Sequence, residues 1–296
     1  TEKGWDVSNL ARFEWTDLGP VSVSLEIERK ISNSLIRQKI TFYADSAVIR
    51  FDTYVDWKEH QHLLKVHFPV DLHTDEATFD IQFGNLTRKI HRNTSWDEAR
   101  FESCGQKWMD MSEGHYGVSM LNDCKYGHSA LDGVMTLTLI KSGIEPNPTA
   151  DQEEHTFTYA LYPHAEGWRQ AKTVQEAMKL NQPALSAEGG CAGDETSFVW
   201  IDKQNVIIET VKEAEDGDGV IIRLYESENA RTKAHISFEK PVASVESCDC
   251  VEKTKETVCV AGDGFDITIK PYEIQTYRVR FLSLIHISEP TRPLYI

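Results

Sequence analysis

The segment 122–127 reads Asn-Asp-Cys-Lys-Tyr-Gly and combines an amide, a carboxylate, an ammonium and a phenol. Asn122, Asp123, Lys125 and Tyr126 are the residue types that bind sugars, because hydroxyls need donors and acceptors while C–H faces stack on aromatic rings. We expect these four residues to lie near a substrate. An ordinary turn is the alternative, with Asp123 bonded to nearby backbone and Gly127 at positive φ.

A second polar position ends an apolar stretch at Tyr162-Pro163-His164. His164 can hydrogen-bond a sugar or a loop across a domain interface. It can equally be a polar residue that caps a helix beginning near Gly167. Both interpretations stay open.

Residues 93–116 show no clear periodicity, so we expect long loops there, and a further polar and aromatic cluster lies at the start of this stretch. Its members are Arg92, Asn93, Trp96, Asp97 and Arg100. Arg and Trp are common anchors of interfaces, because they combine a large apolar area with directed hydrogen bonds. We favour a buried ion-pair network or an inter-domain contact for these five residues.

The sequence gives little support for a metal site or a nucleotide-binding site. His60 and His62 have the spacing that places two ring nitrogens on one face of a strand, but a site needs a third protein ligand and none is evident. We therefore expect no metal site in this chain. The neighbouring carboxylates of Asp75-Glu76 and of Glu153-Glu154 would point to opposite faces of a strand, so neither pair can flank one glycosidic bond. Phosphate-binding glycine motifs are absent from the sequence.

The composition narrows the class of protein. The formal net charge is −16 over 296 residues, so nucleic acid and anionic membrane are poor partners. The sequence holds no apolar run that could span a bilayer and no apolar leader, and it starts without Met, as a fragment or processed chain would. Six scattered cysteines, none in a C-x-x-C pair, indicate reduced thiols and a cytoplasmic location: Cys104, Cys124, Cys191, Cys248, Cys250 and Cys259.

The elements that must position these residues are mostly strands. Apolar Val21, Val23, Leu25 and Ile27 alternate with polar residues, which predicts a strand with one buried face. Similar strands are expected at 35–43, 47–57, 63–70, 134–140 and 156–162. One helix is expected from the spacing of Trp168, Ala171, Val174 and Met178, ended by Pro183. Seven further strands are expected at 198–201, 205–211, 220–225, 234–238, 257–260, 265–270 and 274–281.

We therefore expect an all-β protein: a large antiparallel β-sandwich, one short helix, and a small C-terminal β-sandwich. The expected boundaries are 1–185 for the large domain, 186–194 for a glycine-rich linker and 195–282 for the small domain. Residues 283–296 lack strand alternation and resemble the translation of a sequencing adapter, so we expect a non-native or unstructured tail.

Long blocks of sequence resemble the C-terminal region of glycoside hydrolase family 38, the α-mannosidases. They occupy residues 57–70, 81–85, 91–102, 117–127 and 155–168, in the order of the family. The resemblance implies a supersandwich of the galactose-mutarotase type. It also implies a retaining α-mannosidase that uses two carboxylates and a divalent ion, zinc or similar, all in an N-terminal half without counterpart here.

The resemblance makes this chain a catalytically incomplete fragment that packs on the missing N-terminal catalytic domain and completes its sugar site. α-Mannosides are then the substrates, while a homo-oligomer stays open. Two other interpretations of the β pattern are a stand-alone carbohydrate-binding module and a mutarotase-like epimerase, since one fold serves many functions.

Overall fold

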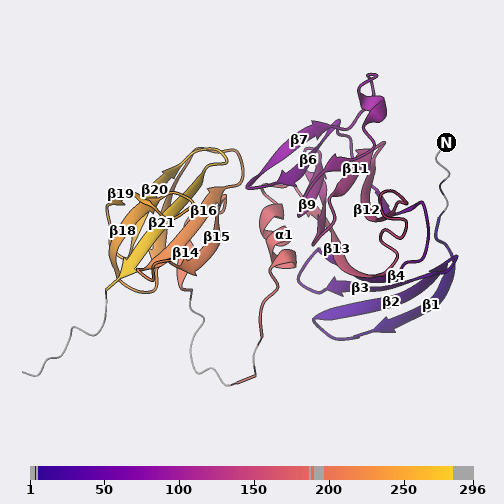
Figure 1. Ribbon diagram of the computed structural model, residues 1–296, viewed down its shortest axis with the longest axis horizontal. Coiled ribbons are helices and arrows are strands. Elements are labelled where there is room, and N and C mark those ends of the chain that lie inside the picture. The colour runs from indigo at the N-terminus through magenta and orange to yellow at the C-terminus, as the bar shows by residue number, and fades with distance from the viewer. Residues whose placement is uncertain (1–3, 5, 187, 190–196, 283–296) are drawn as a thin grey trace, which may run out of the picture. The chain divides into compact units, whose positions relative to one another are not determined.

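The computed structural model describes residues 4, 6–186, 188–189 and 197–282. The chain divides between residues 186 and 187 into two compact units, which we name the large and the small sandwich (Figure 1). Most of the expected linker 186–194 and all of the expected tail 283–296 lie outside the described residues, as does Cys191.

The large sandwich is built from two antiparallel sheets. In spatial order, the nine-stranded sheet contains β1 (Leu10–Thr16), β2 (Ser22–Ile31), β3 (Ser34–Tyr43), β4 (Ile49–Asp56), β13 (Glu154–Ala165), β10 (Tyr116–Asn122), β9 (Trp108–Ser112), β6 (Glu76–Ile81) and β7 (Gly84–Lys89). The four-stranded sheet contains β5 (His62–Pro69), β12 (Val134–Ser142), β11 (Gly127–Leu131) and β8 (Ser103–Cys104).

The core of the large sandwich lies between these sheets. Val55 and Met120 of the nine-stranded sheet and Met135 and Leu137 of the four-stranded sheet are completely buried in one apolar cluster. The burial of each such side chain stabilises the folded protein by about 1.5–3 kcal/mol. The all-β class is confirmed, and the six strands expected here, from 21–28 to 156–162, correspond to β2, β3, β4, β5, β12 and β13.

The expectation of long loops over residues 93–116 is wrong in part. A one-turn 3₁₀ helix, η1 (Asp97–Ala99), and two strands, β8 and β9, lie within this stretch. Strand β9 shows no alternation because both of its faces are covered. Met109 and Met111 join the core between the sheets, whereas Trp108 packs against Trp168, with 5.1 Å between ring centroids.

One α-helix, α1 (Thr173–Asn181), follows β13 and contacts β10 and β9. It is shorter than expected, because residues 169–172 form turns and the helix begins only after Lys172, whose φ is 57°. The helix ends at Asn181, two residues before Pro183, as expected from the restriction that proline imposes on the preceding residue. Among the described residues, no helix has the length and hydropathy of a bilayer span.

The small sandwich packs a three-stranded sheet on a five-stranded one. The first contains β14 (Val199–Ile201), β17 (Thr232–Phe238) and β20 (Gly264–Ile269); the second contains β15 (Val206–Glu213), β16 (Val220–Glu226), β21 (Ile274–Phe281), β18 (Val242–Cys248) and β19 (Thr254–Val258). The expected strands are all present, but β18 was missed. Its Ala243 and Ser244, at the β-bulge that β18 forms against β21, interrupt the apolar run.

The segment 216–219, Asp-Gly-Asp-Gly, lies in the turn that joins β15 to β16. Gly217 and Gly219 have φ of 75° and 99°, conformations that only glycine adopts readily. In the large sandwich Asp132 and Gly133 form the two-residue turn between β11 and β12, also at positive φ. The five described cysteines are free thiols.

Candidate functional site

His164 is buried on the side of β10 and β13 that faces helix α1. Its Nε2 lies 2.8 Å from Oδ2 of Asp110 on β9, and both side chains are 2% exposed. Ser119 Oγ on β10 donates to the same carboxylate oxygen at 2.8 Å and lies 2.7 Å from Thr173 Oγ1, at the start of the helix. These four side chains therefore fix the helix against the nine-stranded sheet.

The arrangement is a structural hydrogen-bond network and not a nucleophilic triad. His164 Nδ1 faces the carbonyl oxygen of Glu166 at 3.2 Å, while Nε2 faces both Asp110 and, at 3.1 Å, Ser119. The Ser119 hydroxyl donates to Asp110 and not to the imidazole, so Ser119 is not held as a nucleophile by His164. The expected role of His164 as a helix cap is wrong, because α1 begins nine residues later, at Thr173.

Gly117 opposes His164 across β10 and β13. A Cβ at residue 117 would come 2.4 Å from His164 Cε1 and equally close to Ser112 Oγ. A glycine is therefore required here by the close approach of the imidazole ring, and any larger residue would displace His164 from Asp110.

The loop 122–127 joins β10 to β11, and its first residue is part of the interior. Asn122 is 1% exposed, its Nδ2 donates to Gln106 O at 2.8 Å, and its Oδ1 accepts from Lys125 N at 2.6 Å. His128 lies 3.4 Å from the same amide nitrogen. Both polar atoms of the Asn122 side chain are thus bonded within the protein, so this residue supports the loop from its buried side.

Asp123, Lys125 and Tyr126 form the outer part of this loop. Asp123 Oδ2 accepts from Thr158 N at 2.9 Å, and Lys125 Nζ lies 4.3 Å from the centre of the Phe157 ring. Tyr126 is 57% exposed. Burial, and secondarily Asp123, raises the pKa of the Cys124 thiol to about 11, so the thiolate needed for nucleophilic chemistry is disfavoured.

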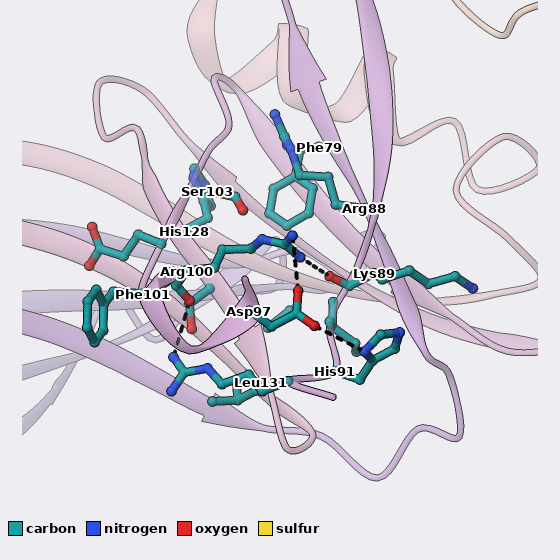
Figure 2. Close-up of a pocket in the computed structure, with 15 residues that line it drawn as sticks. Phe79, Arg88, Lys89, His91, Asp97, Arg100, Phe101, Ser103, His128 and Leu131 are labelled. Carbon is teal, nitrogen blue, oxygen red and sulfur yellow. Dashed lines mark hydrogen bonds and ion pairs between the residues drawn. The ribbon is translucent and has the colours of Figure 1, made fainter. Parts of the chain in front are cut away.

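The cluster expected as an interface surrounds η1 and is largely at the surface. Asp97 is buried and accepts from Thr94 Oγ1 at 2.9 Å and from Arg100 Nη2 at 3.1 Å. The Thr94 hydroxyl and backbone, and then Arg100, lower the pKa of the Asp97 carboxyl. Arg92, Asn93, Trp96 and Arg100 are exposed. Figure 2 shows Arg100 and His91 approaching Asp97 from two sides.

Arg88 on β7 lines the cavity next to this cluster, and sequence reasoning missed it. Its guanidinium carbon lies 4.7 Å from the centre of the buried Phe79 ring, and Figure 2 draws the two side by side. In the sequence, Thr87-Arg88-Lys89 resembles the solvated end of any edge strand. Nothing local to Arg88 reveals that residues from β6, β8 and β11 enclose it.

The two histidines of the H-x-H pair do not converge. His60 Nδ1 lies 2.8 Å from Gln152 Nε2, and the His62 ring hydrogen-bonds the carbonyl oxygen of His60. Over the described part of the chain, no group of three His, Cys, Asp or Glu side chains is placed to hold a metal ion. The described residues therefore do not fit the divalent ion that the resemblance implies.

These features define a two-sandwich β protein whose polar loops adjoin buried, structural ion pairs. Residues 1–149 match the family model of the "Glycosyl hydrolases family 38 C-terminal domain". Residues 205–277 match that of the "Glycosyl hydrolases family 38 C-terminal beta sandwich domain". The chain belongs to glycosyl hydrolase family 38 and corresponds to its C-terminal region.

Its relatives include longer chains that are named alpha-mannosidase. It is 35% identical over 254 residues to alpha-mannosidase G of Dictyostelium discoideum, covering 83% of this chain and 23% of the relative. It is 34% identical over 265 residues to human alpha-mannosidase 2C1, covering 87% and 25% respectively. The chain thus spans about a quarter of the length of these relatives.

A solved structure shares the fold. The structure of an alpha-mannosidase from Enterococcus faecalis V583 superimposes with a TM-score of 0.74 at 19% identity, covering 92% of this chain and 35% of that one. The similarity extends across both sandwiches, since 92% of the chain cannot be matched by the large one alone.

Proposed function

We propose that this chain is the C-terminal β region of a retaining α-mannosidase, which removes terminal α-D-mannosyl residues. The observation that supports this most strongly is the match of both sandwiches, in order, to the two C-terminal domains of family 38. Two relatives that are 35% and 34% identical to this chain are named alpha-mannosidase. In this proposal α-mannosides are the substrates and an N-terminal catalytic domain is the partner.

The nucleophile and the acid/base residue are proposed to come from that partner domain. Retaining hydrolysis needs two carboxylates about 5–5.5 Å apart on either side of the glycosidic bond. The carboxylates next to the candidate loops are engaged otherwise: Asp110 with His164, Asp97 with Arg100, and Asp123 with the backbone of Thr158. A divalent ion, if present, would also be held outside this chain.

In the loop 122–127, we propose that some side chains contact the sugar or the catalytic domain and that others only support the loop. Asp123, Lys125 and Tyr126 lie at the surface with polar groups available to sugar hydroxyls or to the catalytic domain. Asn122 and His164 are positioning residues, because they are buried and bonded to the protein itself. Their proposed role is to fix the position and orientation of the exposed residues of the loop.

The exposed side chains around η1 are proposed to contact the catalytic domain. Trp96 is 86% exposed, an unusual position for so large an apolar ring in an isolated protein. Arg92, Asn93 and Arg100 surround it with donors that can pair with a polar rim. A cytoplasmic location completes the proposal, supported by the free state of the five described cysteines.

The test compares two variants of the full-length enzyme. Tyr126→Phe changes the exposed part of the loop, and Asn122→Asp changes its buried first residue. We expect Tyr126→Phe to lower kcat/KM by about tenfold without changing the unfolding midpoint, since one positioned hydroxyl is lost. Asn122→Asp should lower both, because it places a charge in the interior. An unchanged kcat/KM in Tyr126→Phe would contradict the proposed contact between the loop and the sugar.

A further inference from the structure

A small cavity of about 30 Å³ opens beside β7 and β11 in the large sandwich. Phe79, Arg88, His91, Arg92 and Arg100 contribute to its lining, together with His128 and its neighbours on β11 (Figure 2). A space of this size holds a group of a few heavy atoms or one or two waters, and it excludes a sugar ring. The cavity is therefore not a binding site for mannose.

Two nitrogen atoms at this cavity are buried without a hydrogen-bond partner. Over the described residues, four buried side-chain polar atoms lack a partner, and two of the four, Arg88 Nη1 and His91 Nδ1, belong to residues that line this one cavity. Buried polar atoms in folded proteins are almost always satisfied, so an orphaned donor indicates a missing water or ion. The guanidinium of Arg88 can only donate, which selects an acceptor as the missing group, whereas the role of His91 Nδ1 depends on the tautomer and this atom lies 3.8 Å from Asp97 Oδ2.

The ion pairs around the cavity leave positive charge inside it. Lys89 turns to Asp75 at 2.8 Å, and Glu102 turns to Lys65 at 2.6 Å, so both are engaged elsewhere. Asp97 is shared between Arg100 at 3.1 Å and His91 at 3.8 Å. In the described part of the chain, no ion pair includes Arg88 or Arg92; Arg92 donates instead to the carbonyl oxygen of Arg100, 3.3 Å away.

An uncompensated guanidinium is costly to bury, and desolvation accordingly lowers the pKa of Arg88. The protein as a whole carries a net charge of −16, so a local excess of cations is not a consequence of composition. Guanidinium groups bind phosphate and carboxylate through a planar fork of donors, which gives two hydrogen bonds of matched geometry.

We propose that this cavity is a binding site for a small oxyanion, a phosphate or carboxylate group, with Arg88 as its principal cation and Arg92 and Arg100 at its rim. A bound oxyanion supplies the acceptor that Arg88 Nη1 lacks. It also balances the positive charge of Arg88 and Arg92, because Asp97 already pairs with Arg100. The site does not depend on the proposed glycosidase function, because it needs only groups of this chain.

The experiment is a nuclear magnetic resonance titration of the ¹⁵N-labelled chain with inorganic phosphate at constant ionic strength, with sodium chloride replaced as phosphate is added. We expect saturable shifts of the backbone amides of residues 88–92 and 128–131. Arg88→Met, which keeps the length of the side chain and removes its charge, should raise the dissociation constant at least tenfold. Arg12→Met, at an exposed arginine on β1, should leave it unchanged.

A second titration with sodium acetate distinguishes the two sources of the oxyanion. Saturation by phosphate alone identifies a phosphate site, whereas saturation by both identifies a site that a carboxylate side chain can also fill. Equal dissociation constants in the wild type and Arg88→Met, or no saturable shift with either anion, would overturn the proposal. Arg88→Lys, which keeps the charge but loses the fork, should weaken binding at least threefold and serves if Arg88→Met does not fold.

Discussion

His164 and Asp110 are 54 residues apart in the sequence, yet Nε2 of one lies 2.8 Å from Oδ2 of the other in the interior of the large sandwich. This pair joins β13 to β9 across β10 and, through Ser119, reaches the first residue of α1. Buried hydrogen bonds therefore attach the helix to one side of the nine-stranded sheet, whereas the side that faces the other sheet is apolar.

Asp110→Asn should destabilise the large sandwich by about 2–3 kcal/mol, because the carboxylate oxygen that serves buried Ser119 and His164 is replaced and one of these groups loses its partner. The measurement is urea-induced unfolding followed by a probe in the large sandwich. The exposed pair His115–Glu166, at 3.4 Å, offers a matched control. Glu166→Gln should change stability by less than about 0.5 kcal/mol. Equal effects of the two substitutions would contradict a structural role for the buried pair.

Asn122→Ala and Asp123→Ala should differ although the residues are neighbours. Asn122 is buried and bonded to Gln106 O and Lys125 N, so its loss leaves interior groups unpaired and should cost about 2–3 kcal/mol. Asp123 is exposed and gives up one bond to Thr158 N, worth about 1 kcal/mol. Thermal unfolding of both variants tests this order. A larger loss in Asp123→Ala would contradict the buried role of Asn122.

Burial lowers the pKa of His128 to about 4 from its ordinary value of 6.5. Between these values the unfolded chain binds a proton that the folded chain excludes, so stability falls as the pH falls from 6.5 towards 4. At pH 5 the loss from this residue is about 2 kcal/mol relative to pH 7. His128→Gln should remove that part of the pH dependence. Parallel stability curves for wild type and variant from pH 7 to pH 5 would contradict it.

Arg278 on β21 anchors the hairpin of the small sandwich. Its Nη1 lies 2.7 and 2.8 Å from the two carboxylate oxygens of Asp216 and donates to Asp218 O at 3.0 Å. Lysine cannot reproduce this set of bonds. We expect Arg278→Lys to lower the thermal midpoint of the small sandwich by about 5 °C. Arg231→Lys, at an exposed arginine of the same unit, should lower it by less than about 1 °C.

Sequence reasoning was most successful where one face of a strand is buried and the other is in solvent. Strand β20 alternates visibly for that reason, because Phe265, Ile267 and Ile269 are buried whereas Asp266 and Thr268 are exposed. Strand β9 could not be recognised, because Trp108 and Asp110 face the helix side while Met109 and Met111 face the core, and every position except the last is buried. Periodicity disappears when both faces are covered.

The candidate sites show the same limit. The residue types of 122–127 pointed to a polar loop, but the burial of Asn122 depends on Gln106 and His128, which the sequence does not connect to it. His164 was singled out without its partner Asp110. Arg88 was not singled out, because its environment comes from strands separated along the chain. Residue types identify polar loops, whereas tertiary contacts decide which members are free to bind.

The central claim is that this chain supports catalysis in a family 38 α-mannosidase without carrying the catalytic groups. The most direct measurement is the hydrolysis of an aryl α-mannoside by the purified 296-residue chain, with and without added Zn²⁺ or Co²⁺. The account predicts no turnover above the buffer rate under either condition. Robust hydrolysis that co-purifies with the folded chain and is lost on its unfolding would contradict it.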